Sequence, residues 1–416
     1  MAAMHGLYCW RQPEKTVYLS AIVTKLTQTQ VGDFFEETAG MVDVVISGTG
    51  LFVPPSRITN EQLVDAFNQH VDQYNAENRA DIDAGLMPAK QHSSAAFIEK
   101  ASGIKARHLI DVEGVMDLNR MMSKLPEGGH GDTENPSVQA HMGIEAGKMA
   151  LEQAGLNGAD IDYLVCSSAV MQRAFPAIGI EVQHHLGTKG SALDMVMGCS
   201  SATYGLITGV NAIKAGLANR VLMINPEIFS TMVNFRDRDS HFIFGDIATA
   251  VVLERADLAT ADDQWKVTDT KAHTQYSNNI RSHYGPLTRI DDDSMLREDM
   301  FFVQEGRKVF KELLPLVTGF INEQLQDQKM QVNDLSRMWL HQANINMNLY
   351  AGKKLLGHEP SPEESPTVLD EYGNTAGAGS VVAFHKKRAD LKAGDKGIIC
   401  SFGAGYSIGS LLVEKL

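Results

Sequence analysis

The chain has 416 residues, of which 44% are hydrophobic and 21% are charged, a composition typical of a soluble globular protein with a large core. Its formal net charge of −14 argues against a surface that binds nucleic acid or an anionic membrane. The cysteines are too few and too scattered for a disulfide framework or a zinc site, and we expect neither a metal nor a cofactor; they are Cys9, Cys166, Cys199 and Cys400.

The first 41 residues differ in pattern from the rest of the chain. Their apolar runs, such as residues 17–23, are too short to cross a bilayer, and no small-residue cleavage site follows a basic stretch. We therefore expect a cytoplasmic protein without a membrane partner. A strand pattern begins at Val42 and ends before Pro54, as in many α/β domains. Two interpretations remain open: residues 1–41 are a genuine N-terminal extension, or residues 1–40 are an upstream misreading and the true start is Met41.

Residues 42–235 are expected to form an N-terminal half in which helices and strands alternate. A polar, helical stretch is expected at 60–78, and apolar residues recur at helical spacing over 137–156. Strand patterns follow at 161–168, 192–196 and 220–224. A further strand is expected at 249–253. Helices placed between strands predict parallel sheets covered by helices, which is an α/β fold.

Residues 236–416 are expected to form a C-terminal half that repeats this order. The polar and acidic interval 257–297 predicts loops. A long helix is expected from Phe302 to about Leu325, then a strand at 336–342 and a second helix at 346–356. The segment 393–402 resembles 216–225. The repeated order indicates an internal duplication of one αβ unit.

Cys199 stands at a junction that favours a reactive thiol. An apolar strand, 193–196, runs into a small-residue turn, and a helical pattern begins at the cysteine. Free backbone N–H groups and the positive end of a helix dipole stabilise a thiolate at such a place. We therefore expect the pKa of Cys199 to lie below the ordinary thiol value of about 8.5. The alternative is a cysteine that only packs in the core.

Two later segments place further polar side chains at comparable junctions. His341 ends a strand in His341-Gln-Ala-Asn344, and Asn374 lies in a small-residue turn before the apolar run that begins at Val381. Ligands of α/β sheets bind at such strand ends. Each residue alone could have a structural role, the histidine in a loop and the asparagine in a turn. Three such residues in Gly/Ala-rich junctions of one chain favour a chemical role.

A cysteine beside an imidazole and a carboxamide suits acyl transfer. Cys199 would carry an acyl group as a thioester. His341 Nε2–H and the Asn374 amide would then stabilise an enolate oxygen, at about 3–4 kcal/mol for each donor. A carbanion formed by loss of CO2 needs no strong base, whereas a hydrolase would need His341 to activate water.

With these residues the chain resembles the β-ketoacyl-ACP synthase III family, a branch of the thiolase superfamily of condensing enzymes. The resemblance covers about residues 42–416. It rests on five motifs in the expected order, which are Asp194–Gly205, Phe244–Glu254, His341–Asn344, Gly373-Asn374-Thr375 and Phe402–Ser410.

The resemblance implies a homodimer with a thiolase-like five-layered αβαβα fold built from two duplicated halves. It implies an acyltransferase of fatty-acid biosynthesis, in which an acyl-CoA or acyl-ACP primer loads Cys199 and the acyl group is condensed with malonyl-ACP to give 3-oxoacyl-ACP. His341 and Asn374 would promote the decarboxylation. The backbone N–H groups of Cys199 and Ala404 would form the oxyanion hole, although relatives usually have glycine at the second position.

The resemblance also implies roles outside the reaction centre. Phe175 would cross the dimer interface and help to close the partner's acyl pocket, and Lys311 and Lys354 would attract the acyl carrier protein. Phe97 and Ala101 stand where many relatives hold CoA with Trp and Arg, and Asn346 replaces a phosphate-binding Arg.

These replacements remove two cations, which argues against ordinary use of acetyl-CoA, and Lys100 and Arg307 are candidates to compensate. The chain is longer than usual at 60–97 and 115–138, where the insertions could form a lid or reshape the pocket for a longer primer.

Two alternatives remain open. A related condensing or acyl-transfer enzyme of a secondary-metabolite or long-chain-ketone pathway would fit the same motifs. Relatives that condense without decarboxylation usually use a carboxylate base, for which Glu227 is the nearest candidate, although a structural role for Glu227 is favoured. A non-catalytic subunit would commonly lack the cysteine or the His/Asn pair, and all three residues are present here.

Overall fold

The computed structural model describes residues 42–285, 288 and 297–416. The chain divides into two units, and the account below concerns the second, Asp43–Leu416. The interpretations of residues 1–41 lie outside the described residues.

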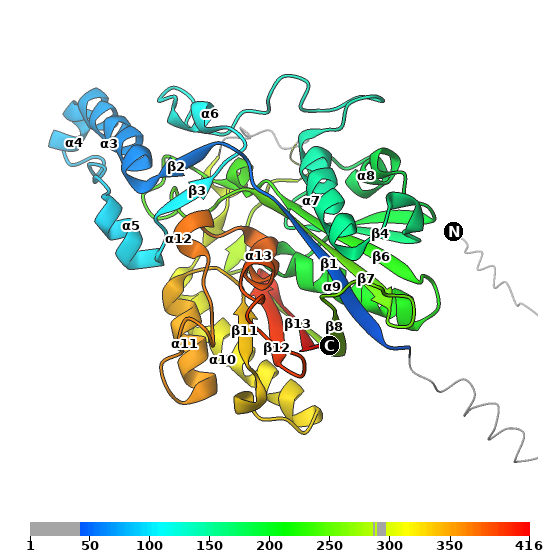
Figure 1. Ribbon diagram of the computed structural model, residues 1–416. Helices are drawn as coiled ribbons and strands as arrows, with labels where there is room; N and C mark the ends of the chain where they lie inside the picture. Colours follow the sequence, from blue (N-terminus) through cyan, green and yellow to red (C-terminus); the bar gives the residue numbers. More distant parts are fainter. Residues whose placement is uncertain (1–41, 286–287, 289–296) are drawn as a thin grey trace, which may run out of the picture. The chain divides into compact units, whose positions relative to one another are not determined.

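A nine-stranded mixed sheet forms the framework of this unit (Figure 1). Its order in space is β5-β4-β6-β7-β1-β8-β13-β12-β11. The strands are β1 Val44–Phe52, β4 Tyr163–Ser168, β5 Ser191–Val196, β6 Arg220–Glu227, β7 Ile247–Arg255, β8 Trp265–Ser277, β11 Arg337–Leu340, β12 Lys396–Gly403 and β13 Gly405–Lys415.

Two groups of strands with the same pairing pattern make up this sheet. In the first, β4 pairs with β6 in parallel and β6 with β7 in antiparallel fashion. In the second, β11 pairs with β12 in parallel and β12 with β13 in antiparallel fashion. The groups join where β1 pairs with β8 over three residues, Val44–Ile46. The same sequence of pairings in each group agrees with the duplication expected from the sequence.

Helices lie in three layers around the two groups of strands. Helices α7 (Val138–Ala154) and α8 (Ile178–Leu186) cover the first group, and α10 (Gly306–Asp327) and α11 (Ile345–Leu356) cover the second. Between the groups lie α9 (Ser201–Lys214), which contacts strands of both, and α13 (Gly379–Lys386) (Figure 1). The order of layers is therefore αβαβα, as expected.

Close packing of α7 on β1 depends on two glycines. A Cβ at Gly48 would lie 2.1 Å from the Ala150 carbonyl oxygen, and one at Gly50 would lie 1.9 Å from that of Ala146. Any side chain at either position would push the helix off the sheet. The Val-Ile-Ser-Gly-Thr-Gly pattern therefore specifies both a buried strand and the helix that covers it.

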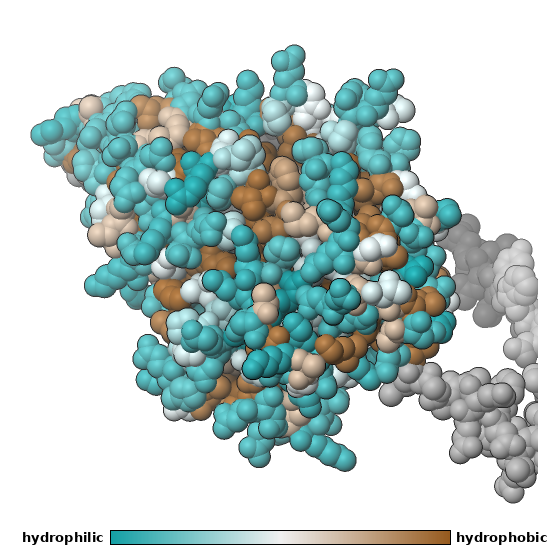
Figure 2. Space-filling model, in the orientation of Figure 1, coloured by the Kyte–Doolittle hydropathy of each residue, from teal (hydrophilic) through white to brown (hydrophobic). Residues whose placement is uncertain are grey.

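Smaller elements surround these layers. Helix α3 begins with a capping box in which Thr59 and Gln62 satisfy each other's backbone N–H groups. The remaining elements are β2 Arg57–Thr59 paired with β3 Ala106–His108, β9 Ile280–Arg281 paired with β10 Val303–Gln304, α3 Asn60–Glu77, α4 Arg79–Asp83, α5 Ala95–Ser102, α6 Val112–Met116 and α12 Leu369–Tyr372. Hydrophilic residues predominate on the face shown in Figure 2.

The helices and strands expected at the sequence level are present, most of them within a few residues of the expected ends. The prediction of loops over 257–297 is wrong, because the 13-residue strand β8 occupies Trp265–Ser277. Only Trp265 and Val267 of this strand are buried, so it shows almost no apolar alternation, and pairing with β13 and β1 defines it.

The division into halves at residues 235 and 236 stays a prediction. Strand pairing favours a later division, since β7 is hydrogen-bonded to β6 and β1 of the first group.

Among the described residues, every helix is too short or too polar to cross a membrane.

Candidate active site

Cys199 lies in a single 3-10 turn, Gly198–Ser200, between β5 and α9. Gly198 has φ +53°, a left-handed conformation that glycine adopts without strain. The Ser201 hydroxyl donates to the Gly198 carbonyl at 2.7 Å and accepts from Met197 N–H at 3.1 Å. These bonds fix the turn, and Cys199 is a buried residue with 8% of its surface exposed.

The hairpin between β12 and β13 closes over the sulfur. A Cβ at Gly403 would lie 2.5 Å from Cys199 Cβ and 3.1 Å from its Sγ, so this position must be glycine. The backbone N–H groups of Cys199 itself and of Ala404 both act on the thiol and lower its pKa. The structure therefore brings together the two backbone donors that the sequence analysis assigned to an oxyanion hole.

The thiol of Cys199 is not ionised at neutral pH. Burial, followed by the nearby Glu227 carboxylate, raises the pKa of Cys199 to about 12, against the lowering by the two N–H groups. The expectation of a pKa below the ordinary thiol value is wrong for the ligand-free site. Its physical reason is that the turn lies inside the protein, where loss of hydration disfavours the thiolate more than the helix terminus favours it.

His341 directly follows β11, and its backbone N–H donates to Cys400 of β12 at 2.8 Å. The ring packs edge-on against Phe402, with centroids 5.3 Å apart. Phe402 adjoins Gly403, which contacts Cys199. Burial lowers the pKa of His341 to about 4, so the imidazole is neutral at pH 7.

The neutral ring of His341 carries one N–H. Its Nδ1 is buried and has no hydrogen-bond partner among the described residues. A buried N–H without an acceptor is rarer than an unused lone pair, so the tautomer with the proton on Nε2 is favoured. This tautomer is the one that can donate to a ligand oxygen, as the sequence analysis expected.

Asn374 follows α12 and is 6% exposed. Its Oδ1 accepts from the backbone N–H of Ala376 at 3.0 Å, which fixes the amide plane. Its backbone forms a bridge to Phe244, with hydrogen bonds to Ile243 and from Gly245. Because Nδ2 makes no hydrogen bond within the described part of the chain, it is the group available to a ligand.

The turn that carries Cys199 and the turn after Asn374 pack against each other. The second is the 3-10 turn Ala376–Ala378, at the start of α13. A Cβ at Gly377 would lie 3.1 Å from the Cβ of Ser201, which follows the cysteine turn. Cys199, His341, Asn374 and Ala404 therefore occupy adjoining turns at the ends of β5, β11, α12 and β12, although they come from four distant parts of the sequence.

Glu227 lies beneath these turns as a fully buried carboxylate. It accepts hydrogen bonds from Ala169 N–H, Ser168 Oγ, Asn225 Nδ2 and Gly377 N–H, all within 3.1 Å. Burial raises the pKa of Glu227 to about 7 despite these donors. Since its oxygens are occupied by groups that hold the framework, this arrangement favours the structural role over that of a catalytic base.

Phe97 and Arg238 form a stacked pair some way from the cysteine. The Arg238 guanidinium lies 4.5 Å from the centroid of the Phe97 ring, and its Nε donates to His92. The amides of Asn344 and Asn346 both donate to the Ala101 carbonyl. Arg238 was not among the residues expected from the sequence, although it lies only six residues before Phe244, where the second family motif begins.

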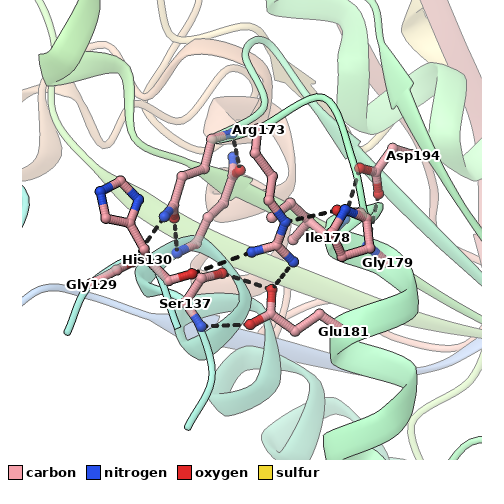
Figure 3. A network of polar contacts seen from close by, with 11 residues as sticks. Gly129, His130, Ser137, Arg173, Ile178, Gly179, Glu181 and Asp194 are labelled. Atoms are coloured by element: carbon pink, nitrogen blue, oxygen red, sulfur yellow. Dashed lines mark hydrogen bonds and ion pairs between the residues drawn. The ribbon is translucent and has the colours of Figure 1, made fainter. Parts of the chain in front are cut away.

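Phe175 projects from the loop between β4 and α8 with 83% of its surface exposed. A network of polar contacts holds this loop (Figure 3). Arg173 donates to the Pro176 carbonyl at 2.8 Å and pairs with Glu181 of α8 at 2.5 Å. Glu181 also accepts from the backbone N–H and the hydroxyl of Ser137. An exposed phenylalanine on a braced loop is expected where another surface covers it.

Lys311 on α10 and Lys354 on α11 are both exposed and belong to the same layer of helices. Lys354 Nζ lies 5.7 Å from the centroid of the Tyr350 ring, and Phe310 packs edge-on against that ring.

Among the described residues, no three His, Cys, Asp or Glu side chains form a group that could hold a metal ion.

Comparisons with known proteins agree with this arrangement. Residues 193–275 match the family model of 3-oxoacyl-[acyl-carrier-protein (ACP)] synthase III, and residues 325–415 match that of its C-terminal part. The chain is 48% identical to the β-ketodecanoyl-[acyl-carrier-protein] synthase of Pseudomonas aeruginosa over 352 residues, which is 85% of this chain and 100% of that protein.

More distant relatives extend the same similarity. The chain is 32% identical to the β-ketoacyl-[acyl-carrier-protein] synthase III of Allorhizobium ampelinum, over 69% of this chain and 85% of that protein. The crystal structure of 3-oxoacyl-[acyl-carrier-protein] synthase III from Aquifex aeolicus superimposes with a TM-score of 0.68 at 23% identity, covering 89% of this chain and 99% of that one. This likeness confirms the thiolase-like fold.

Proposed function

Because this chain belongs to the 3-oxoacyl-[acyl-carrier-protein] synthase III family, we propose that Cys199, His341 and Asn374 perform its condensation reaction. The protein is an acyltransferase-class condensing enzyme of fatty-acid biosynthesis. The observation that carries the residue assignment is the convergence of a buried thiol, two backbone N–H groups and two neutral side-chain donors in adjoining turns.

The first step is transfer of the acyl group to Cys199. The sulfur forms a bond to the thioester carbonyl of the primer, and the carbonyl oxygen receives the N–H groups of Cys199 and Ala404. The bond to the donor's sulfur then breaks, and the donor thiol leaves with the proton that the cysteine loses. This exchange of one thiol for another needs no net base, which suits a cysteine whose pKa is raised to about 12.

The second step is formation of the carbon nucleophile. Malonyl-ACP loses CO2, and the electron pair of the broken C–C bond forms an enolate on the malonyl thioester. His341 Nε2–H and Asn374 Nδ2–H donate to that enolate oxygen. Both donors are neutral, buried and held in place before the substrate arrives, so they stabilise the developing charge without reorganisation.

The third step joins the two fragments. The enolate carbon attacks the acyl carbonyl on Cys199, and the oxyanion again receives the N–H groups of Cys199 and Ala404. Collapse expels the cysteine sulfur, which takes up a proton, and releases 3-oxoacyl-ACP. Ala404 can replace glycine because only its backbone N–H takes part in the reaction. A Cβ on Gly198 would lie 3.3 Å from the Cβ of Ala404, so glycine at position 198 leaves room for the alanine side chain.

We propose that the primer is an acyl group of medium length. The relative of 48% identity is named for a ten-carbon product. Since malonyl-ACP contributes two of those carbons, an eight-carbon primer corresponds to that product. The sequence expectation of a longer primer, drawn from the insertions, agrees with this proposal.

A homodimer formed through β5 fits the exposed surface of the first group of strands. β5 is the last strand of the sheet on that side, and an unpaired edge invites a strand from another chain. Exposed apolar side chains surround it, with Phe175 83%, Val196 56% and Ile180 49% exposed. A second copy related by a two-fold axis would pair β5 with β5 and cover these residues.

Two further parts of the proposal concern partner and place. Lys311 and Lys354 stand on adjacent exposed helices and would receive the acidic surface of the acyl carrier protein. The protein would act in the cytoplasm, where its carrier-bound substrates are made.

The experiment that tests this proposal is the intact mass of the protein after incubation with acyl-CoAs from acetyl to dodecanoyl. We expect one acyl increment, largest for the medium-length chains, on the wild-type protein and none on Cys199→Ser. A matched Cys400→Ser variant, at a buried cysteine of β12, should still be acylated. An increment that persists on Cys199→Ser would refute the assignment of the nucleophile.

A further inference from the structure

Arg107 is a fully buried arginine that the proposed reaction does not use. It lies in β3, and only 1% of its surface is exposed. Its Nη2 donates to the side-chain oxygen of Asn60 at 2.7 Å and to the carbonyl of Phe242 at 3.0 Å. Both acceptors are neutral, and no carboxylate of the described residues lies within ion-pair distance of the guanidinium.

The buried guanidinium of Arg107 is costly to the fold. Its Nε and Nη1 are also buried, and neither finds a hydrogen-bond partner in the part of the chain that the structure describes. Burial and then repulsion from Arg57 lower the pKa of Arg107 to about 9, in spite of attraction from Glu61. The group therefore still carries its charge at pH 7. An unpaired buried charge destabilises a fold strongly, and groups held at such a cost concentrate at functional sites.

The stem of Arg107 lies against two glycines that adjoin Asn374 and its backbone partner. A Cβ at Gly245 would lie 3.1 Å from Arg107 Cβ, and one at Gly373 would lie 3.4 Å from it. Gly373 directly precedes Asn374 in the chain. A Cβ at Gly245 would also lie 2.3 Å from the Tyr372 carbonyl oxygen, so this position must be glycine. Arg107 therefore packs on both backbone segments that meet at Asn374.

The guanidinium of Arg107 holds the segment that fixes the backbone of Asn374. The carbonyl of Ile243 accepts from Asn374 N–H at 2.9 Å, and Gly245 N–H donates to the Asn374 carbonyl at 3.0 Å. Phe242, whose carbonyl receives Arg107 Nη2, is the residue immediately before Ile243. A shift of this segment would move the Asn374 backbone and change the direction of its Nδ2.

Backbone hydrogen bonds on either side of Arg107 join β3 to the same two segments. Strand β3 lies beside α12, the helix that ends two residues before Asn374 (Figure 1). Lys105 N–H donates to the Asp370 carbonyl of α12 at 3.1 Å, and Asp246 N–H donates to the His108 carbonyl at 2.7 Å. The main chain of β3 therefore supports both segments, and the side chain of Arg107 lies between these two contacts.

Resting on the proposed function, we infer that Arg107 is a positioning residue for the decarboxylation step and acts through Asn374. It holds residues 242–245 in place, and these residues hold the amide in the direction from which Nδ2 donates to the enolate oxygen. A displaced donor loses much of its effect, because the enolate is stabilised by groups that are already in position. Acylation of Cys199 does not use this amide and does not depend on Arg107.

The test measures the two half-reactions in Arg107→Gln and Arg107→Lys. In Arg107→Gln, kcat for CO2 release from malonyl-ACP should fall at least about tenfold with little change in KM, while acylation of Cys199 by octanoyl-CoA stays within about twofold of the wild type. Arg107→Lys keeps a charge and a donor and should recover part of the lost rate.

Arg388→Gln is the matched control. Arg388 is also buried, but it pairs with Asp263 and donates to carbonyls at the end of α13. Its replacement should lower the thermal unfolding temperature without a selective loss of CO2 release. A selective loss in this control as large as that in Arg107→Gln would overturn the inference.

A double-mutant cycle separates positioning from a general loss of stability. Arg107→Gln should slow CO2 release in the wild-type background but by less than about twofold in an Asn374→Ala background. Full additivity of the two losses would overturn the inference, and so would unchanged CO2 release or equal slowing of both half-reactions in Arg107→Gln. If Arg107→Gln does not fold, Arg107→Lys takes its place in the cycle. Unchanged CO2 release in Asn374→Ala alone would refute the proposed function instead.

Discussion

The turn before α9 and the turn before α13 have the same backbone form but different tasks. Each is a single 3-10 turn that leads into a middle-layer helix, and the first residue of each has a positive φ, +53° at Gly198 and +49° at Ala376. In this alignment Gly377 stands where the first turn has Cys199. Under the proposed function, one copy of the duplicated unit would supply the nucleophile, and the other would hold the Asn374 amide in place.

The largest difference between the two turns is the sulfur itself. Cys199→Ser should abolish both acyl-enzyme formation and condensation, because a serine hydroxyl at this buried site is a far weaker nucleophile than a thiol. The thermal unfolding temperature should change little, since the hydroxyl is close to the thiol in size. Intact mass and differential scanning calorimetry measure the two effects. Retained condensation would show that the turns are not specialised in this way.

Gly377→Ala adds a side chain to the turn before α13, at the position that Cys199 occupies in the turn before α9. The new Cβ would lie 2.6 Å from Glu227 Oε1 and 3.1 Å from Ser201 Cβ, so we expect a loss of about 1–3 kcal/mol in the free energy of unfolding. Urea denaturation measures it. Gly319→Ala on α10, where the added Cβ meets nothing within 4 Å, should instead stabilise by about 0.5–1 kcal/mol.

Glu227 connects the two turns electrostatically, because it accepts from Gly377 and its charge raises the pKa of Cys199. Glu227→Gln removes that charge and should lower the pKa of Cys199. The rate of alkylation by iodoacetamide, followed from pH 6 to 11, reports it. In the wild-type protein the rate should still rise at pH 10. A plateau below pH 9 would contradict the burial argument.

The carboxyl of Glu227 also makes stability depend on pH. Its pKa in the folded protein is raised to about 7 from an ordinary value of 4.5, so the folded state holds this proton where the unfolded state has lost it. The contribution of Glu227 to stability should therefore fall as the pH rises from about 4.5 to 7. In the Glu227→Gln variant, the free energy of unfolding should not show this part of its decrease with rising pH.

The smallest expected effect concerns the positive φ of Ala376. An L-residue in this region is strained by about 1–2 kcal/mol, and glycine removes that strain at an entropic cost of about 0.5–1 kcal/mol. Ala376→Gly should therefore be neutral or stabilising by up to about 1.5 kcal/mol. Ala378→Gly, in an ordinary helical conformation (φ −77°), should be destabilising. Equal effects in the two variants would remove the argument from backbone strain.

The sequence was sufficient for the order of elements, and it identified the residues that we propose for the reaction centre. Gly48 and Gly50 within an apolar strand, and Cys199, His341 and Asn374 at strand ends or helix starts, each leave a local pattern. Strand β8 has no such local pattern beyond Trp265 and Val267, because its hydrogen bonds to neighbouring strands make it a strand. The raised pKa of Cys199 was also beyond prediction, since desolvation comes from the β12–β13 hairpin, two hundred residues away in the chain.

A cavity lined by residues of both insertions shows the same limit. Lys90, Arg120 and Arg236 lie in polar stretches that look like ordinary surface in the sequence, and only the fold brings them into one cavity, which Asp117, Asp237, Asp239 and Glu298 also line. The insertions at 60–97 and 115–138 were identified, but which parts of the chain they would meet depends on long-range packing.

The most direct test of the account is the effect of Asn374→Ala on the two half-reactions in one protein preparation. The rate of Cys199 acylation by octanoyl-CoA, followed by intact mass, should stay within about twofold of the wild type. Release of CO2 from malonyl-ACP should slow by about 10²–10³-fold, the usual effect of removing one preorganised donor. Equal slowing of both steps, or unchanged CO2 release, would contradict the assignment of this amide to the enolate.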